Sequence, residues 1–91
     1  MSSVLVTIKI MPDSPERDLE SVKQEMIVKI EDFGGRVAKT EIEEIAFGLK
    51  ALKIIFIMDE SLGDLEPLEE SLKDVEGVES VETIDVRRAI G

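Results

Sequence analysis

Two apolar segments limit the folds open to this chain more than any other feature. Residues 4–11 alternate their side chains between two faces with a period of two, which predicts a strand. Residues 49–58 are apolar on both faces toward their end, which predicts a central strand. A helical pattern follows each segment, so we expect two units of strand and helix around one core.

A helix and a weaker strand are predicted between these segments. Ser14 and Pro15 supply an N-cap with proline at the first helical position, so we expect the helix to begin there. Glycines at 34–35 end it. Residues 36–47 change phase partway, which indicates an edge strand or a bulged one. The apolar stripe of the helix comprises Leu19, Val22, Met26, Ile30 and Phe33.

A second helix and a last strand complete the pattern. Pro67 is tolerated in the first turn of this helix, Gly77 closes it, and a strand is expected from Val78 to about Val86. The order β-α-β-β-α-β predicts an α+β, ferredoxin-like fold: a four-stranded antiparallel sheet with both helices on one face and the first and third strands in the middle. The second apolar stripe comprises Leu65, Leu68, Leu72 and Val75.

Composition excludes several classes of function. A chain of 91 residues buries one core, so we expect a single domain over residues 1–91. The chain has neither cysteine nor histidine, which excludes zinc-thiolate sites, thiol nucleophiles and Ser-His-Asp catalysis. A hydrolytic enzyme is therefore not expected, and we predict no catalytic residue and no cofactor.

Charge and hydropathy set expectations about partners. The net charge of −10 opposes direct nucleic-acid binding. No apolar run approaches the length of about 20 residues that spans a bilayer, and a cleavable leader pattern is missing, so we expect a cytoplasmic protein without membrane contact. The acidic stretches "EIEE" and "DLEPLEE" lack calcium-loop spacing and fit a solvated surface. We assign no metal site to them.

Phe47 is the one aromatic residue that the core pattern does not explain. It stands beside Gly48 in an expected turn between two strands, whereas the other two phenylalanines fit the core. Its ring either folds back over the edge of the core or enters a pocket on a partner, as interface anchors do. In the second case, Lys50 and Lys53 add attraction for an acidic neighbour.

Arg87 and Arg88 are the only adjacent cations, and they lie where the last strand is expected to run out into a short apolar tail. Either they form a solubilising end that pairs with local acids, or they reach on a mobile arm into a site that holds a metal ion or a phosphate.

Three segments, "VTIKIMPDSPERDLESVK", "IAFGLKALKI" and "GVESVETIDVRR", resemble the archaeal type of elongation factor 1-beta, and the likeness covers essentially the whole chain. The resemblance implies a guanine nucleotide exchange factor that promotes release of GDP from elongation factor 1-alpha, so that GTP can rebind during translation elongation. Such a factor does no covalent chemistry. It displaces Mg²⁺ from the GTPase and distorts the switch regions that hold the nucleotide.

The resemblance also implies roles for residues. Phe47 matches the family's hairpin phenylalanine, which is placed against the nucleotide domain of the GTPase. Eukaryotic relatives direct a C-terminal lysine at the Mg²⁺ site, where this chain has Arg87 and Arg88; a forked guanidinium can instead contact a phosphate or an acidic rim. The predicted partner-binding residues are Phe47, Gly48, Lys50, Arg87 and Arg88.

A regulatory module of the ACT type, which binds a small amino acid, is the alternative that the same element order permits. Such a module is expected to bring a glycine-containing loop after the first strand close to the ligand. The corresponding stretch here, "MPDSPERD", has no glycine, which favours the exchange factor.

Overall fold

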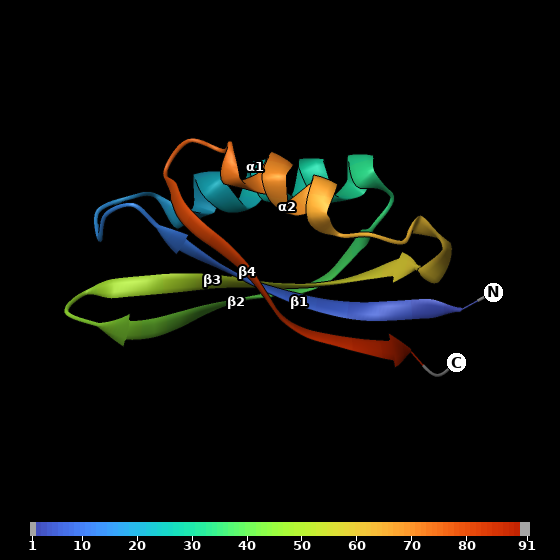
Figure 1. Ribbon diagram of the computed structural model, residues 1–91. Coiled ribbons are helices and arrows are strands. Elements are labelled where there is room, and N and C mark those ends of the chain that lie inside the picture. Colours follow the sequence, from blue (N-terminus) through green and yellow to red (C-terminus); the bar gives the residue numbers. More distant parts are fainter. Residues whose placement is uncertain (1, 90–91) are drawn as a thin grey trace.

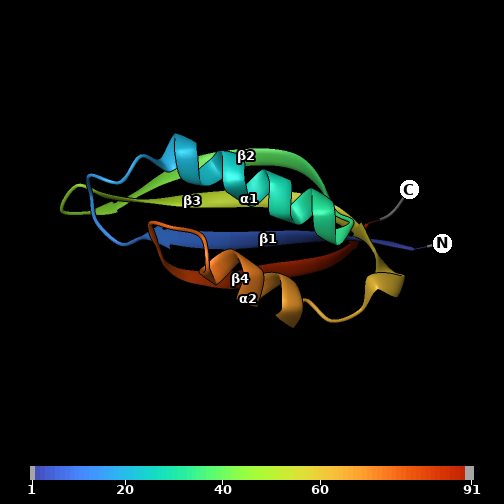
Figure 2. The ribbon, with the colours of Figure 1, turned by 90° about the horizontal axis from the view of Figure 1, so that it is seen from above.

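The computed structural model describes residues 2–89 and has the predicted order of elements. The strands form one antiparallel sheet in the order β2-β3-β1-β4, with β1 and β3 in the middle. Both helices cover the same face of this sheet, and the other face carries no helix (Figures 1 and 2). The predicted ferredoxin-like fold is confirmed. The elements are β1 (Ser3–Pro12), α1 (Leu19–Phe33), β2 (Arg36–Ala46), β3 (Leu49–Asp59), a 3₁₀ turn (Glu60–Leu62), α2 (Glu66–Lys73) and β4 (Val78–Ala89).

The core lies between the sheet and the two helices. The period of two along β1 and β3 turns every second side chain toward the helices, and the predicted helical stripes meet them. Burial of these aliphatic side chains is the main term that stabilises the fold, at about 25 cal/mol for each Å² removed from water. The most deeply buried side chains are Val6, Ile10, Met26, Ile30, Leu52, Ile54, Phe56 and Leu72.

Strand β2 lies at one edge of the sheet and is irregular, as its change of phase predicts. Its register against β3 shifts between Val37 and Lys39, and again between Glu44 and Ala46. Each shift turns the following side chains to the other face. This is why the apolar residues of β2 do not keep a single phase in the sequence.

The start of α1 corrects the prediction that a helix begins at Ser14. The helix begins at Leu19, and Asp18 is its N-cap, with the backbone N–H of Glu20 donating to the Asp18 carboxylate. Ser14 instead closes a turn, because its hydroxyl accepts from the N–H of Glu16 and its carbonyl accepts from the N–H of Arg17. A serine followed by proline serves a turn as well as a helix start.

The second half of the chain corrects two further boundaries. Helix α2 ends at Lys73, and Gly77 lies in the following turn with φ of 94°. Strand β4 continues to Ala89, and its residues Arg87 and Arg88 pair with Leu5 and Val4 of β1. The arginines therefore belong to the sheet and do not sit on a mobile arm. Ile90 and Gly91 lie outside the described residues.

Within residues 2–89, no helix is long and apolar enough to cross a membrane.

Candidate functional site

The turn between β2 and β3 presents Phe47 to solvent. Ala46 pairs with Leu49, so Phe47 and Gly48 form a two-residue connection at the end of the hairpin. The relative exposure of Phe47 is 101%, which means that its ring contacts almost nothing in the protein. Of the two interpretations of Phe47, the one in which its ring folds back over the edge of the core is therefore wrong.

The backbone at Phe47 is as unusual as its exposure. Its φ is 53°, and that of Gly48 is 78°, the pattern of positive angles that a tight type I′ hairpin requires. Among residues 2–89, Phe47 is the only non-glycine residue with positive φ. Such turns favour asparagine or glycine, and a bulky side chain there costs about 1–2 kcal/mol. Neither packing nor turn geometry explains the phenylalanine.

A groove runs from the hairpin toward the loop between β1 and α1. It has a volume of about 410 Å³, and Lys50, Gly48 and Ile42 form its hairpin side. Ile42 is 52% exposed, although it pairs with the fully buried Leu52 on the side of the sheet that faces the helices. Lys50 makes no ion pair with any residue in the described part of the chain and can attract an acidic partner. The opposite side consists of Pro12, Pro15, Arg17, Asp18, Leu19 and Glu20.

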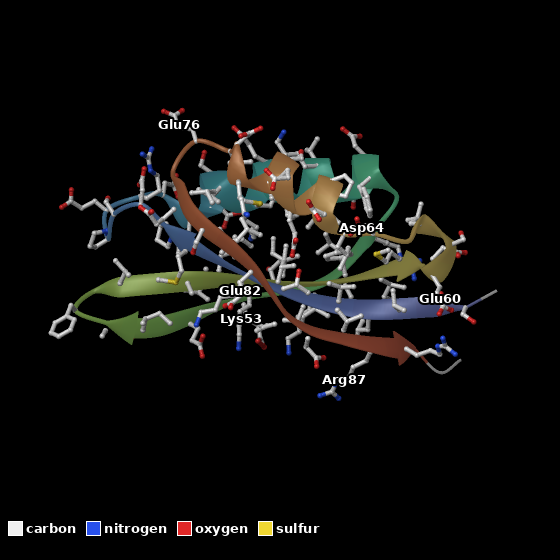
Figure 3. All side chains as sticks on the ribbon, viewed as in Figure 1. Lys53, Glu60, Asp64, Glu76, Glu82 and Arg87 are labelled. Atoms are coloured by element: carbon white, nitrogen blue, oxygen red, sulfur yellow. The ribbon has the colours of Figure 1, made fainter. Side chains whose placement is uncertain are left out.

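Lys53 differs from Lys50, although the two lie close together in the sequence. Its ammonium nitrogen is 3.8 Å from Oε2 of Glu43, and the other carboxylate oxygen of Glu43, Oε1, is 3.8 Å from the ammonium nitrogen of Lys9. Strand alternation places Lys53 on the face opposite to Lys50, away from the helices (Figure 3). Lys53 thus has an acid within its own sheet, and we assign the hairpin contact to Lys50.

At the other end of the sheet, the two arginines have different surroundings. The Nε of Arg87 donates to Asp85 at 2.8 Å, and Arg87 points away from the helices (Figure 3). Arg88 lies on the other face and donates to Glu60, in the 3₁₀ turn that follows β3. Both arginines remain exposed. Local pairing, one of the two sequence interpretations, is therefore present, and it leaves both guanidinium groups accessible.

The acids of this end are held by local hydrogen bonds. The backbone N–H of Ser61 donates to Asp59 at 2.8 Å and lowers the pKa of that carboxyl below its usual value. At the opposite end of the molecule, the Arg17 guanidinium lowers the pKa of Asp13 in the same way. Among the described residues, no group of three or more acidic side chains is arranged to hold a metal ion.

The structure separates the two predicted contact regions. The hairpin tip lies at one end of the long axis, and the last residues of β4 lie at the other, as Figures 1 and 2 both show. That axis extends over 42 Å. Sequence reasoning did not identify Ile42 or Glu60 as parts of these regions. A signal for Ile42 was present in the sequence, because Ile42 and Val37 lie in opposite phases of β2. No signal was present for Glu60, because Arg88, which it contacts, is 28 residues away along the chain.

Comparison with known proteins identifies relatives along nearly the whole chain. Residues 5–89 match the family described as the EF-1 guanine nucleotide exchange domain. An elongation factor 1-beta from Methanothermobacter thermautotrophicus is 44% identical over 97% of this chain and 98% of its own length. Elongation factor 1-beta from Staphylothermus marinus is 45% identical over 97% of this chain and 98% of its own.

Solved structures share the fold at lower identity. The ACT domain of a GTP pyrophosphokinase from Chlorobium tepidum has a TM-score of 0.61 at 17% identity and covers 90% of this chain and 99% of its own. The C-terminal domain of the MgtC protein from Mycobacterium tuberculosis has a TM-score of 0.60 at 14% identity, over 98% of this chain and 88% of its own. These likenesses concern the fold alone. The match over residues 5–89 and the full-length relatives show that the chain belongs to the EF-1 guanine nucleotide exchange domain family, as an elongation factor 1-beta.

Proposed function

We propose that this chain accelerates the release of GDP from elongation factor 1-alpha in the cytoplasm by contacting that GTPase with both ends of its sheet. The guanine nucleotide exchange activity is that of the family. The observation that carries the choice of contact is Phe47, whose strained backbone and full exposure both disfavour it in the free protein. An apolar ring that a partner buries recovers about 1.5–3 kcal/mol, which offsets these costs.

The exchange proceeds without covalent chemistry on this chain. A GTPase holds GDP through backbone amides of its phosphate loop and through Mg²⁺, so a partner that disturbs these groups weakens nucleotide binding. By linkage, GDP weakens the binding of the partner by the same factor. Phe47 and Lys50 supply one contact, and Arg87 or Arg88 supplies a cation that competes with Mg²⁺ or binds a phosphate.

The test is the rate at which a fluorescent GDP analogue leaves purified elongation factor 1-alpha, with and without this chain. Substoichiometric amounts should accelerate release, because the factor dissociates and acts again. Repeating the assay at two Mg²⁺ concentrations separates the routes: an acceleration that shrinks in excess Mg²⁺ supports ion displacement. If release from an active GTPase does not change, the proposed function is wrong for this partner.

A further inference from the structure

The face of the sheet without helices presents an ordered arrangement of side chains. The registers of β2, β3, β1 and β4 place one residue from each strand in rows that cross the sheet. Neighbouring strands lie about 4.8 Å apart, so a row of four spans about 14 Å. Three of these rows are Arg36-Ile57-Leu5-Arg87, Lys39-Ile55-Thr7-Asp85 and Glu41-Lys53-Lys9-Glu82.

The charges of the row Glu41-Lys53-Lys9-Glu82 are neutralised within the sheet. Lys9 and Lys53 face each other directly, an arrangement that is unfavourable unless acids compensate it. Glu43 approaches both lysines, while Glu41 and Glu82 flank them in the row. These charges are therefore engaged with one another and have little left for a partner.

The row nearest the end of the sheet, Arg36-Ile57-Leu5-Arg87, combines an apolar centre with a cation on each side. Ile57 and Leu5 form an apolar pair, with Arg36 on one flank and Arg87 on the other. No acidic side chain among residues 2–89 forms an ion pair with exposed Arg36, and Arg87 pairs only with its neighbour Asp85. We call Arg36, Ile57, Leu5 and Arg87, together with Ile55 of the next row, the end band.

Charge distinguishes the two faces of the molecule. Helices α1 and α2 together carry seven acidic and three basic residues. The open face of the sheet is close to neutral: the three rows above carry five basic and three acidic residues, and Glu43 and Asp59 add two more acids on this face. An acidic partner is therefore repelled by the helical side and less so by the sheet side, where Arg36 and Arg87 of the end band can attract it. Arg87 joins the end band to the contact proposed above, so the band extends that contact across all four strands.

We propose that the end band is a docking surface for the GTPase, and that its occupant is an apolar strip with acidic side chains on both flanks. This inference rests on the proposed function and adds the face on which the partner lies. Guanidinium groups suit the role, because they form paired hydrogen bonds with carboxylates and keep their charge when a surface covers them.

The first experiment follows the methyl NMR signals of this chain as GDP-bound elongation factor 1-alpha is added. Signals of Leu5, Ile55 and Ile57 should shift or broaden, while those of Val28 stay unchanged. Val28 is the matched control because it is 59% exposed on α1. Shifts at Val28 without shifts in the end band would overturn the proposal. So would end-band shifts that arise when the chain alone is concentrated, since these identify a second copy as the occupant.

The second experiment compares the affinities of Arg36→Gln and Lys73→Gln for the same GTPase. Each substitution removes one exposed positive charge, so any difference reports position and not net charge. Arg36→Gln should bind at least about fivefold more weakly than Lys73→Gln. Equal affinities would overturn the proposal that the end band is a docking surface, but would not contradict the proposed exchange function. An unsubstituted chain that fails to accelerate GDP release would instead remove the proposed function itself.

Discussion

Phe47 shows at the scale of one residue how a functional side chain departs from what folding alone selects. A two-residue turn with two positive φ angles is met at least cost by asparagine and glycine. This chain keeps the glycine, at Gly48, and replaces the asparagine by an exposed aromatic ring. Such local conflicts with folding preference are expected at functional sites.

We predict that Phe47→Asn separates folding from exchange. Asparagine tolerates the left-handed conformation, so the free energy of unfolding should rise by about 0.5–1 kcal/mol while exchange falls strongly. Denaturant unfolding and the GDP-release rate provide the two measurements. Phe47→Ala is the companion variant, because it removes the ring and keeps an unfavourable φ. Parallel losses of stability and activity would place the ring in the fold.

Asp59 supports a prediction about acid. The N–H of Ser61 lowers its pKa in the folded state, so the interaction is fully present above the unfolded value of about 3.9 and is lost as the pH falls through the lower folded value. Asp59→Asn keeps an acceptor oxygen and removes the titration. The slope of stability against pH should therefore be shallower for this variant below about pH 4. Identical slopes for the variant and the unsubstituted chain would show that Asp59 does not contribute to the pH dependence of stability.

At the scale of elements, periodicity predicted the order and type of the two α-helices and four strands, because the apolar stripe of α1 and the alternation of β1 and β3 report which side faces the core. It did not predict the 3₁₀ turn at Glu60–Leu62. Boundaries were harder. The turn at Ser14 and the extension of β4 to Ala89 depend on hydrogen bonds to Glu16 and to β1 that composition does not reveal. The roles proposed for Lys50, Arg87 and Arg88 remain predictions.

The alternation of β4 leads to a prediction for Arg87 and Arg88. Reversing both charges to glutamate should weaken association with the GTPase, and the defect should depend on salt, because attraction between exposed charges is screened beyond about 8 Å at physiological ionic strength. Binding isotherms at several salt concentrations measure this. Normal binding of the double variant at low salt would contradict a role for the pair.

A charge swap can distinguish the role of Arg88 in the ion pair with Glu60 from a role in binding the GTPase. The double variant Arg88→Glu with Glu60→Arg keeps an ion pair and leaves the net charge unchanged. Exchange should fall if the partner needs a cation on β4, and it should persist if Arg88 serves only to hold the 3₁₀ turn. Exposed pairs contribute about 0–1 kcal/mol, so thermal unfolding should change little in the swap.

For the whole molecule, added salt should act in opposite directions on folding and on association, because the chain has a net charge of −10 but is expected to bind its partner through cations. Self-repulsion destabilises the compact state, so added salt should stabilise the free chain, and each 1 kcal/mol of relieved repulsion raises the Tm by about 4–8 °C. The same salt should weaken the complex, because it screens the cations of the sheet face. Thermal unfolding and binding over one salt series test both signs. A Tm that falls with salt would show that ion pairs outweigh repulsion.

The separation of the hairpin tip from the end of β4 along an axis of 42 Å has a consequence for the lifetime of the complex. Under the proposed function, the sheet is a stiff spacer that attaches at two points. Once one point is engaged, the other meets its target at a high effective concentration, so two weak attachments combine into a firm one. Release then occurs one end at a time. When a nucleotide binds the GTPase again, it needs to break only one of the two contacts, because the remaining contact alone is too weak to hold this chain.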